Sequence, residues 1–202
     1  MIKPDNKATS YSEVFYIINK ALEEKDSIIV AIDGNSGAGK SCLAVSIARQ
    51  LECNIFHMDD FFLQPHQRTP ERFREPGGNV DYERFKAEVI ENLKANKEFK
   101  YQLYDCASTR LVEWVQVTPK RINIIEGVYS IHPLWSSLLD VKIFLTVSRE
   151  LQLERIRNRS GELLLKRFVE EWIPLEDLYF ETFRIKENCD LVIDTGLQLS
   201  AL

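Results

Sequence analysis

The sequence predicts an α/β fold, with a mainly parallel five-stranded sheet flanked by helices, on the strength of three observations. Short apolar runs of strand length recur along the chain, and most are followed by residues with helical periodicity. That alternation is typical of parallel sheets, because the helix that joins two parallel strands covers a face of the sheet. A glycine-rich loop separates the first such run from its helix. The 202 residues are 45% hydrophobic, which suits one domain over residues 1–202.

The first elements are marked by a helix start and by two apolar runs. Ser10 and Glu13 resemble a capping box, and the apolar residues after them recur at helical spacing. The second apolar run ends in two acids, Asp59 and Asp60. The predicted elements are, in order, a helix at about 11–22, a strand at 27–33, a helix to about residue 51 and a strand at 53–58.

The middle of the chain combines a polar loop, a helix and a hairpin. Residues 64–79 are rich in proline and glycine and predict a long loop. Asp81 is placed to cap a helix that reaches about Ala95. Alternating side chains over 99–104 and 111–117 predict a hairpin-like excursion at about 99–120.

The last third returns to the alternation of strands and helices. Pro174 suits the first turn of a long helix. The predicted elements are strands at 122–125, 141–147 and 191–194 and helices at 134–139, 151–159 and 174–188. These three strands bring the predicted sheet to five.

Residues 34–41 match the pattern G-x-x-x-x-G-K-[ST] between a strand and a helix, which is the context that a phosphate-binding loop requires. Glycines let consecutive amides turn inward, and the following helix adds its positive end. We expect Lys40 to reach the β- and γ-phosphates of ATP and the Ser41 hydroxyl to bind Mg²⁺. The expected nucleotide-binding residues are Gly34, Asn35, Ser36, Gly37, Ala38, Gly39, Lys40, Ser41 and Cys42.

Acidic residues end two further strands, at the edge of the sheet where ligands bind in such folds. Asp59 is the candidate that accepts a proton from a substrate hydroxyl, with a turn cap as the alternative. Asp60 is better explained as a cap. Glu126 ends the strand at 122–125, where a metal-binding acid is expected, directly or through water.

Arginines gather after residue 148 in an otherwise acidic chain. Arg155 and Arg159 are four residues apart and therefore share a helix face. A lid at about 155–170 could present them to the transferred phosphate as catalytic residues and exclude water. The alternative is a solvated face on which these arginines pair with neighbouring glutamates.

Charge and composition narrow the class of protein. The net charge of −5 argues against nucleic acid or an anionic membrane as a partner. There is no apolar run long enough to span a bilayer and no signal-peptide core at the start, so a cytoplasmic location is expected. The four cysteines form no C-x-x-C pair and are expected to be reduced thiols. The oligomeric state is left open, a homo-oligomer included.

Taken in order, these motifs resemble those of uridine kinases and of the wider group of P-loop small-molecule kinases that includes phosphoribulokinase. The resemblance covers about residues 27–195. It rests on the loop at 33–41, Met58 to Phe62, Asn79 to Asp81, Tyr104-Asp105, Thr109-Arg110, Ile125 to Gly127 and Arg155 with Arg159.

The resemblance implies a role for each matching residue. Asp59 corresponds to the acid that accepts the proton of a ribose 5′-hydroxyl, and Asp81 to the acid that holds the 2′- and 3′-hydroxyls. Tyr104 and Arg110 correspond to positions near the nucleoside. Ser41 and Glu126 match the magnesium environment, and Arg155 and Arg159 match arginines of the lid helix.

Two departures weaken the match on the base side of the expected pocket. Cys106 and Ser108 stand where the family usually has an aromatic residue and a histidine, and the segment is one residue shorter. Sites that lose a hydrogen-bond partner for the base discriminate poorly. The matching residues therefore predict phosphoryl transfer more strongly than they predict specificity for uridine.

The expected function is an ATP- and Mg²⁺-dependent kinase that acts on a primary hydroxyl of a small molecule, such as the 5′-hydroxyl of a pyrimidine nucleoside. A kinase for another ribosylated or small alcohol, such as nicotinamide riboside, is the alternative within this class. A regulatory P-loop ATPase and a kinase fold without turnover are alternatives outside it. A guanine-specific switch is disfavoured, because the Asn-Lys pairs at 19 and 96 lack the aspartate of the base-reading motif.

Overall fold

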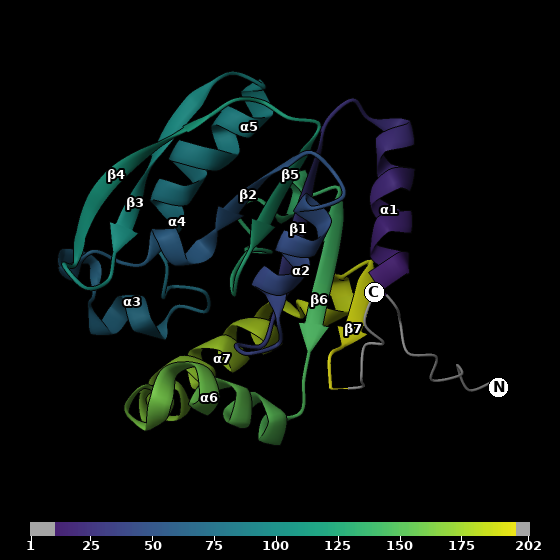
Figure 1. The fold of residues 1–202 in the computed structure, drawn as a ribbon. Coiled ribbons are helices and arrows are strands. Elements are labelled where there is room, and N and C mark those ends of the chain that lie inside the picture. The colour runs from purple at the N-terminus through teal and green to yellow at the C-terminus, as the bar shows by residue number, and fades with distance from the viewer. Residues whose placement is uncertain (1–10, 197–202) are drawn as a thin grey trace.

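A five-stranded parallel sheet forms the centre of the computed structural model, which describes residues 11–196 (Figure 1). The strands lie in the order β2-β5-β1-β6-β7 and all pair in parallel. Their bounds are β1 Ile28–Gly34, β2 Cys53–His57, β5 Ile122–Glu126, β6 Val141–Thr146 and β7 Leu191–Asp194. The α/β fold with a parallel sheet of five strands, predicted from the sequence, is confirmed.

Both faces of the sheet are covered because successive side chains of a strand point to opposite sides. On one face Val30 and Ile32 pack with α1 (Tyr11–Glu24) and α2 (Lys40–Ala48). On the other face Ala31 belongs to a second core that includes residues of α4 (Tyr82–Phe85), of the hairpin formed by β3 (Phe99–Asp105) and β4 (Arg110–Val117), and of α7 (Ile173–Phe183). The helix expected near residue 11 is confirmed, whereas Ser10 of the capping-box pattern lies outside the described residues.

A helix and a hairpin follow the second strand as predicted. The helical segment consists of α4 (Tyr82–Phe85), a π-helical turn (Lys86–Ile90) and α5 (Glu91–Ala95). Strands β3 (Phe99–Asp105) and β4 (Arg110–Val117) form an antiparallel pair with an irregularity between Gln102 and Tyr104. Aromatic contacts attach both to the turn that follows β2, since the Phe61 ring lies 4.8 Å from the Phe85 ring and 5.6 Å from the Tyr101 ring.

The prediction that 64–79 is a loop throughout was wrong in part. The stretch contains a 3₁₀ turn (Pro65–Gln67) and the short helix α3 (Pro70–Arg74). Thr69 caps α3 by accepting a hydrogen bond from the Arg72 amide, and Pro70 occupies its first turn. This cap-and-proline signal was present in the sequence. The helix expected at 134–139 is reduced to a 3₁₀ turn at Ser136–Leu138.

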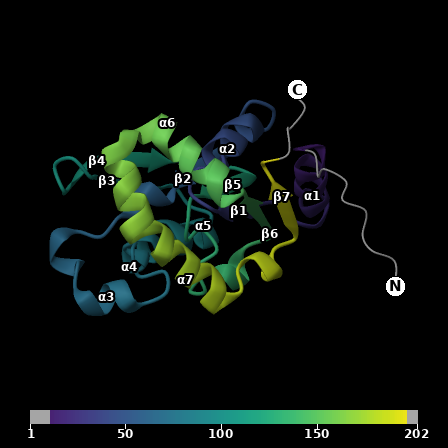
Figure 2. The same cartoon turned by 90° about the horizontal axis from the view of Figure 1, so that it is seen from below.

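Helices α6 (Arg149–Arg167) and α7 (Ile173–Phe183) are joined by a π-helical turn (Phe168–Trp172). Helix α6 extends beyond the helix predicted at 151–159, whereas α7 ends before residue 188, and a separate 3₁₀ turn covers Lys186–Asn188. Gly161 interrupts α6 with φ 78° and ψ 170°, inside the segment expected to act as a lid. Both helices lie beyond the carboxyl ends of the strands (Figure 1), and the view from below places them in front of that edge (Figure 2). Within residues 11–196, no helix is long and apolar enough to cross a membrane.

Candidate active site

The loop at residues 34–41 connects β1 to α2 and closes on its own lysine. The Lys40 ammonium donates to the carbonyl oxygens of Gly34 at 2.8 Å and Asn35 at 3.0 Å, and Lys40 is only 8% exposed. Gly34 has φ 133°, and a Cβ there would lie 2.0 Å from the Leu145 carbonyl oxygen, so only glycine fits. The loop therefore runs tightly against β6, and the Lys40 ammonium is directed from the start of α2 back at the end of β1.

Glu126 ends β5 between two partners from neighbouring segments. Its Oε1 accepts a hydrogen bond from the Ser41 hydroxyl at 3.0 Å and lies 2.5 Å from His57 Nδ1. His57 stands directly opposite Glu126 in the sheet register. The hydrogen bond with this carboxylate raises the pKa of His57 above its ordinary value. Glu126 is 5% exposed, so these partners compensate a carboxylate held largely away from water.

The donor set suits Mg²⁺ bound together with phosphates. Among the described residues no group of three or more His, Cys, Asp or Glu side chains could enclose a metal ion. Magnesium in nucleotide sites usually takes one or two protein oxygens and completes its shell with phosphate oxygens and water. Ser41 and Glu126 supply two adjacent oxygens of that kind.

Asp59 lies in the 3₁₀ turn Met58–Phe61 that follows β2. Its side chain is accessible to solvent but surrounded by protein, and this partial loss of hydration raises the pKa of Asp59. The Glu126 carboxylate raises the pKa further, whereas the charges of Lys40 and Arg159 lower it. Lys40, Asp59, Glu126 and Arg159 thus share one electrostatic environment.

Asp81 is buried at the base of this region rather than exposed to a ligand. It is 3% exposed, caps α4 by accepting from the Arg84 amide at 3.0 Å, and lies 3.6 Å from Arg84 Nε. The Arg84 guanidinium in turn donates to the Asp60 carbonyl at 2.6 Å. Direct contact of Asp81 with ribose hydroxyls, which the resemblance implies, would require this cap to open.

The hairpin carries the two residues expected near a nucleoside. Tyr104 is buried, and its hydroxyl accepts a hydrogen bond from Arg68 at 2.7 Å. Arg110 is exposed at the start of β4, opposite Asp105. Cys106 is exposed at the hairpin tip, but partial loss of hydration raises the pKa of its thiol, and the Asp59 carboxylate adds to the rise. The hairpin tip therefore lies in the electrostatic neighbourhood of Asp59.

The two lid arginines differ in their surroundings. Arg155 donates to the Gly37 carbonyl at 3.2 Å and to the Thr195 hydroxyl and carbonyl at 3.0 and 2.8 Å. Arg159 is exposed, donates to Ser160 and lies 5.7 Å from the centre of the Phe168 ring. Arg155 thus fastens the phosphate loop to the end of β7, and Arg159 is the one that influences Asp59.

Three buried polar residues that contact the loop region were not identified from the sequence, namely Asp33, Glu176 and Tyr179. The Glu176 carboxylate of α7 accepts a hydrogen bond from the Ser36 amide at 3.1 Å and another from the Ser36 hydroxyl. Asp33 accepts from Gly34 and Ile131 amides and from the Tyr179 hydroxyl, at 2.8 to 3.1 Å. Full burial raises the pKa of Asp33 to about 6. The available signal was a helix that places two polar groups, Glu176 and Tyr179, three residues apart on one face.

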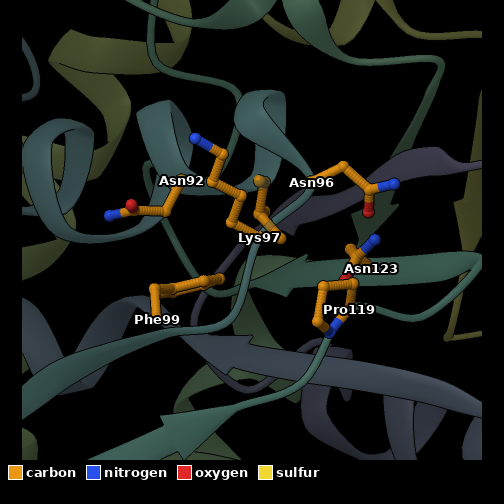
Figure 3. A pocket seen from close by; sticks show the side chains of 7 residues that line it. Asn92, Asn96, Lys97, Phe99, Pro119 and Asn123 are labelled. Atoms are coloured by element: carbon orange, nitrogen blue, oxygen red, sulfur yellow. The ribbon is translucent and has the colours of Figure 1, made fainter.

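A pocket elsewhere does not belong to this site. It is lined by Asn92, Leu93, Asn96, Lys97, Phe99, Pro119 and Asn123 (Figure 3). Asn123 stands near the amino end of β5, three residues before Glu126, so the pocket faces the opposite edge of the sheet. The strand-end chemistry is therefore separate from it.

Two curated relatives illustrate the sequence matches. Uridine-cytidine kinase C of Dictyostelium discoideum is 29% identical over 150 residues, which cover 70% of this chain and 33% of that protein. The chain thus spans about a third of the length of that relative. A uridine kinase of Staphylococcus aureus is 26% identical over 190 residues, 85% of this chain and 89% of that protein. No protein-family model matches the chain.

Two solved structures share the fold. A possible uridine kinase from Bacillus stearothermophilus has a TM-score of 0.65 and 22% identity, covering 90% of this chain and 100% of that one. A protein from Silicibacter sp. TM1040, provisionally described as a fructose transport system kinase, has a TM-score of 0.69 and 20% identity, covering 91% and 98%. With the loop geometry, these neighbours define the class as a P-loop kinase fold.

Within that class, the sequence matches and the structure matches together support a relationship to the uridine kinase-like and phosphoribulokinase-like P-loop kinases. The resemblance seen in the sequence is thereby confirmed. At the coarser level, the matches support a nucleotide-binding phosphotransferase.

Proposed function

We propose that the protein is an ATP- and Mg²⁺-dependent kinase that phosphorylates a primary hydroxyl of a small molecule, with the 5′-hydroxyl of a pyrimidine nucleoside as the preferred acceptor. The observation that carries the proposal is the grouping of Lys40, the Ser41–Glu126 pair and Asp59 at one edge of the sheet. A phosphoryl-transfer enzyme needs a phosphate cradle, metal-binding oxygens and an acid that faces the acceptor hydroxyl.

In this proposal the loop and Lys40 hold the triphosphate. Lys40 exchanges its bonds with the carbonyl oxygens of Gly34 and Asn35 for bonds with β- and γ-phosphate oxygens. The amino end of α2 adds partial positive charge at the same place. Bound through Ser41 and Glu126, Mg²⁺ would neutralise charge on the phosphates.

Asp59 is proposed to orient the acceptor hydroxyl and to accept its proton during transfer. Its solvent-accessible position after β2 leaves room for a hydroxyl, and its surroundings raise its pKa toward the range of a useful base. Lys40 and Arg159 keep it from rising further. Arg159 would stabilise charge on the transferred group and help to exclude water.

The acceptor is proposed to bind between the Asp59 turn and the hairpin, near Tyr104 and Arg110. The curated relatives that act on uridine or cytidine by name favour a nucleoside. Cys106 and Ser108 at the hairpin tip favour a second candidate, a kinase for another ribosylated alcohol such as nicotinamide riboside, because they offer fewer groups that can bind a pyrimidine edge.

The test is incubation of the pure protein with Mg·ATP and a panel of pyrimidine and purine nucleosides, nicotinamide riboside and small alcohols, followed by mass spectrometry. The expected result is one added phosphoryl group on uridine or cytidine, formed faster than on any other acceptor. Addition to nicotinamide riboside alone would favour the second candidate. Hydrolysis of ATP at a rate indifferent to every acceptor would indicate a regulatory ATPase and refute the proposal.

A further inference from the structure

Two polar residues of α7 reach the segment that carries the phosphate loop. Glu176 is 3% exposed and accepts hydrogen bonds from both the amide and the hydroxyl of Ser36. One turn later, the Tyr179 hydroxyl donates to Asp33 at 2.9 Å. Residues three apart lie on the same face of a helix, so this face of α7 is directed at the end of β1 and the start of the loop.

The tip of the loop is also held from α6. Arg155 donates to the carbonyl oxygen of Gly37, the residue next to Ser36. A Cβ added at Gly37 would lie 3.3 Å from the Gln152 carbonyl oxygen and 3.6 Å from Arg155 Cβ, so α6 packs closely on the loop. The two helices that contain and follow the predicted lid therefore bind adjacent loop residues. Helix α6 bonds the Gly37 carbonyl through Arg155, and α7 bonds the Ser36 amide through Glu176.

A buried carboxylate at this position needs a physical reason, because burial of a charge is costly unless hydrogen bonds compensate it. Within the described part of the chain, both hydrogen bonds of Glu176 go to Ser36. The loop holds glycines at 34, 37 and 39, all with positive φ, and such a backbone loses much conformational freedom when it is ordered. A fixed acceptor for Ser36 removes part of that freedom before a ligand binds.

We propose that Glu176 is a positioning residue that pre-orders the tip of the phosphate-binding loop for the nucleotide, acting through Ser36. The inference rests on the proposed function in that the ligand of the loop is taken to be Mg·ATP. It adds a link between the lid helices and the loop, because a movement of α7 would be transmitted to Ser36.

The test compares Glu176→Ala with Asp177→Asn, a change to the neighbouring carboxylate that pairs with Arg149 at 2.6 Å instead. Isothermal titration calorimetry measures the dissociation constant of Mg·ATP without acceptor. We expect E176A to weaken binding about tenfold, because a charged acceptor of a partly buried amide is lost. E176Q, which keeps an acceptor oxygen, should recover most of the affinity, and D177N should match the original protein.

Three further readouts separate positioning from general damage. The KM for ATP should rise in E176A while the KM for the acceptor stays unchanged, whereas loss of folded protein would lower kcat alone. Hydrogen exchange at the Ser36 amide should be faster in E176A without any nucleotide. If E176A fails to fold, Glu176→Asp, whose shorter side chain cannot reach Ser36, should show the same pattern.

Two outcomes distinguish failure of this inference from failure of the proposed function. If the original protein binds Mg·ATP and E176A binds it equally well with unchanged Ser36 exchange, the positioning role is refuted and the function stands. If the original protein binds no Mg·ATP, the proposed function falls, and this inference falls with it.

Discussion

At the scale of single residues, the contacts around Lys40 fix the position of its charge. Its ammonium is nearly buried and bonded to two carbonyl oxygens of its own loop, so its charge is already held where phosphates are proposed to bind. A charge that is already in place stabilises the transition state more than a mobile surface lysine does, because little reorganisation is needed during the reaction.

Lys40→Ala should therefore abolish measurable phosphoryl transfer while the protein remains folded. Turnover with saturating Mg·ATP and the best acceptor from the panel is the measurement. Lys25→Ala is the matched control, since Lys25 is exposed, pairs with Asp140 and lies between α1 and β1 at the other edge of the sheet. Turnover in K40A equal to that in K25A would contradict the role of Lys40.

The site residues that the sequence could propose are those whose meaning is local. The glycine and lysine pattern fixes the loop, and an acid at the end of an apolar strand must lie at the carboxyl edge, so Asp59 and Glu126 could be placed in advance. Glu176 could not, because its partner Ser36 is 140 residues away in the chain. The contact of Arg155 with Thr195 depends likewise on the packing of α6 against β7.

At the level of elements, the start of α4 is the support of the Asp59 turn. Asp81 caps α4 and pairs with Arg84, which is itself 9% exposed. Arg84 bonds the Asp60 carbonyl at 2.6 Å and the Gln102 carbonyl at 2.6 Å, and its guanidinium lies 4.1 Å from the Phe61 ring centre. One arginine thus joins the helix, the hairpin and the turn that carries Asp59.

Asp81→Ala should lower the free energy of unfolding by about 2 kcal/mol, because it removes a helix cap and one partner of a buried arginine. Urea denaturation measures the loss. Thr69→Ala removes the cap of the exposed helix α3 and should cost only about 0.5 kcal/mol. If D81A is as stable as the original protein but binds the acceptor poorly, the ribose-holding role implied by the family resemblance would be favoured instead.

At the scale of the whole molecule, Asp33 joins three segments: β1, the loop after β5 and α7. Its folded-state pKa of about 6 lies above the ordinary value of 3.8. Between pH 4 and 6 the folded protein therefore keeps a proton that the unfolded chain has lost, and this group makes the protein less stable as the pH rises through that window. The Tyr179 hydroxyl limits this loss by stabilising the ionised carboxylate.

Tyr179→Phe should consequently cost more stability at pH 8, where Asp33 is ionised, than at pH 5. We expect about 1 kcal/mol at pH 5 and about 2 kcal/mol at pH 8, because bonds to charged acceptors are the stronger. Tyr129→Phe is the control, since Tyr129 is also buried and its ring packs against Tyr179, but its hydroxyl is not one of the three donors to Asp33, so its effect should differ little between the two pH values. An equal cost of Y179F at pH 5 and pH 8 would show that Asp33 does not ionise in this range.

The central claim, that an acid across from the phosphate loop directs an acceptor hydroxyl at ATP, is tested most directly by comparing kcat with Mg·ATP affinity in Asp59→Asn. The account predicts that kcat falls by about a hundredfold or more while the Mg·ATP dissociation constant changes by less than about threefold. Asp60→Asn, the adjacent matched change, should retain most of its turnover. Unchanged kcat in D59N, or a loss of kcat that only follows a loss of ATP binding, would contradict the account.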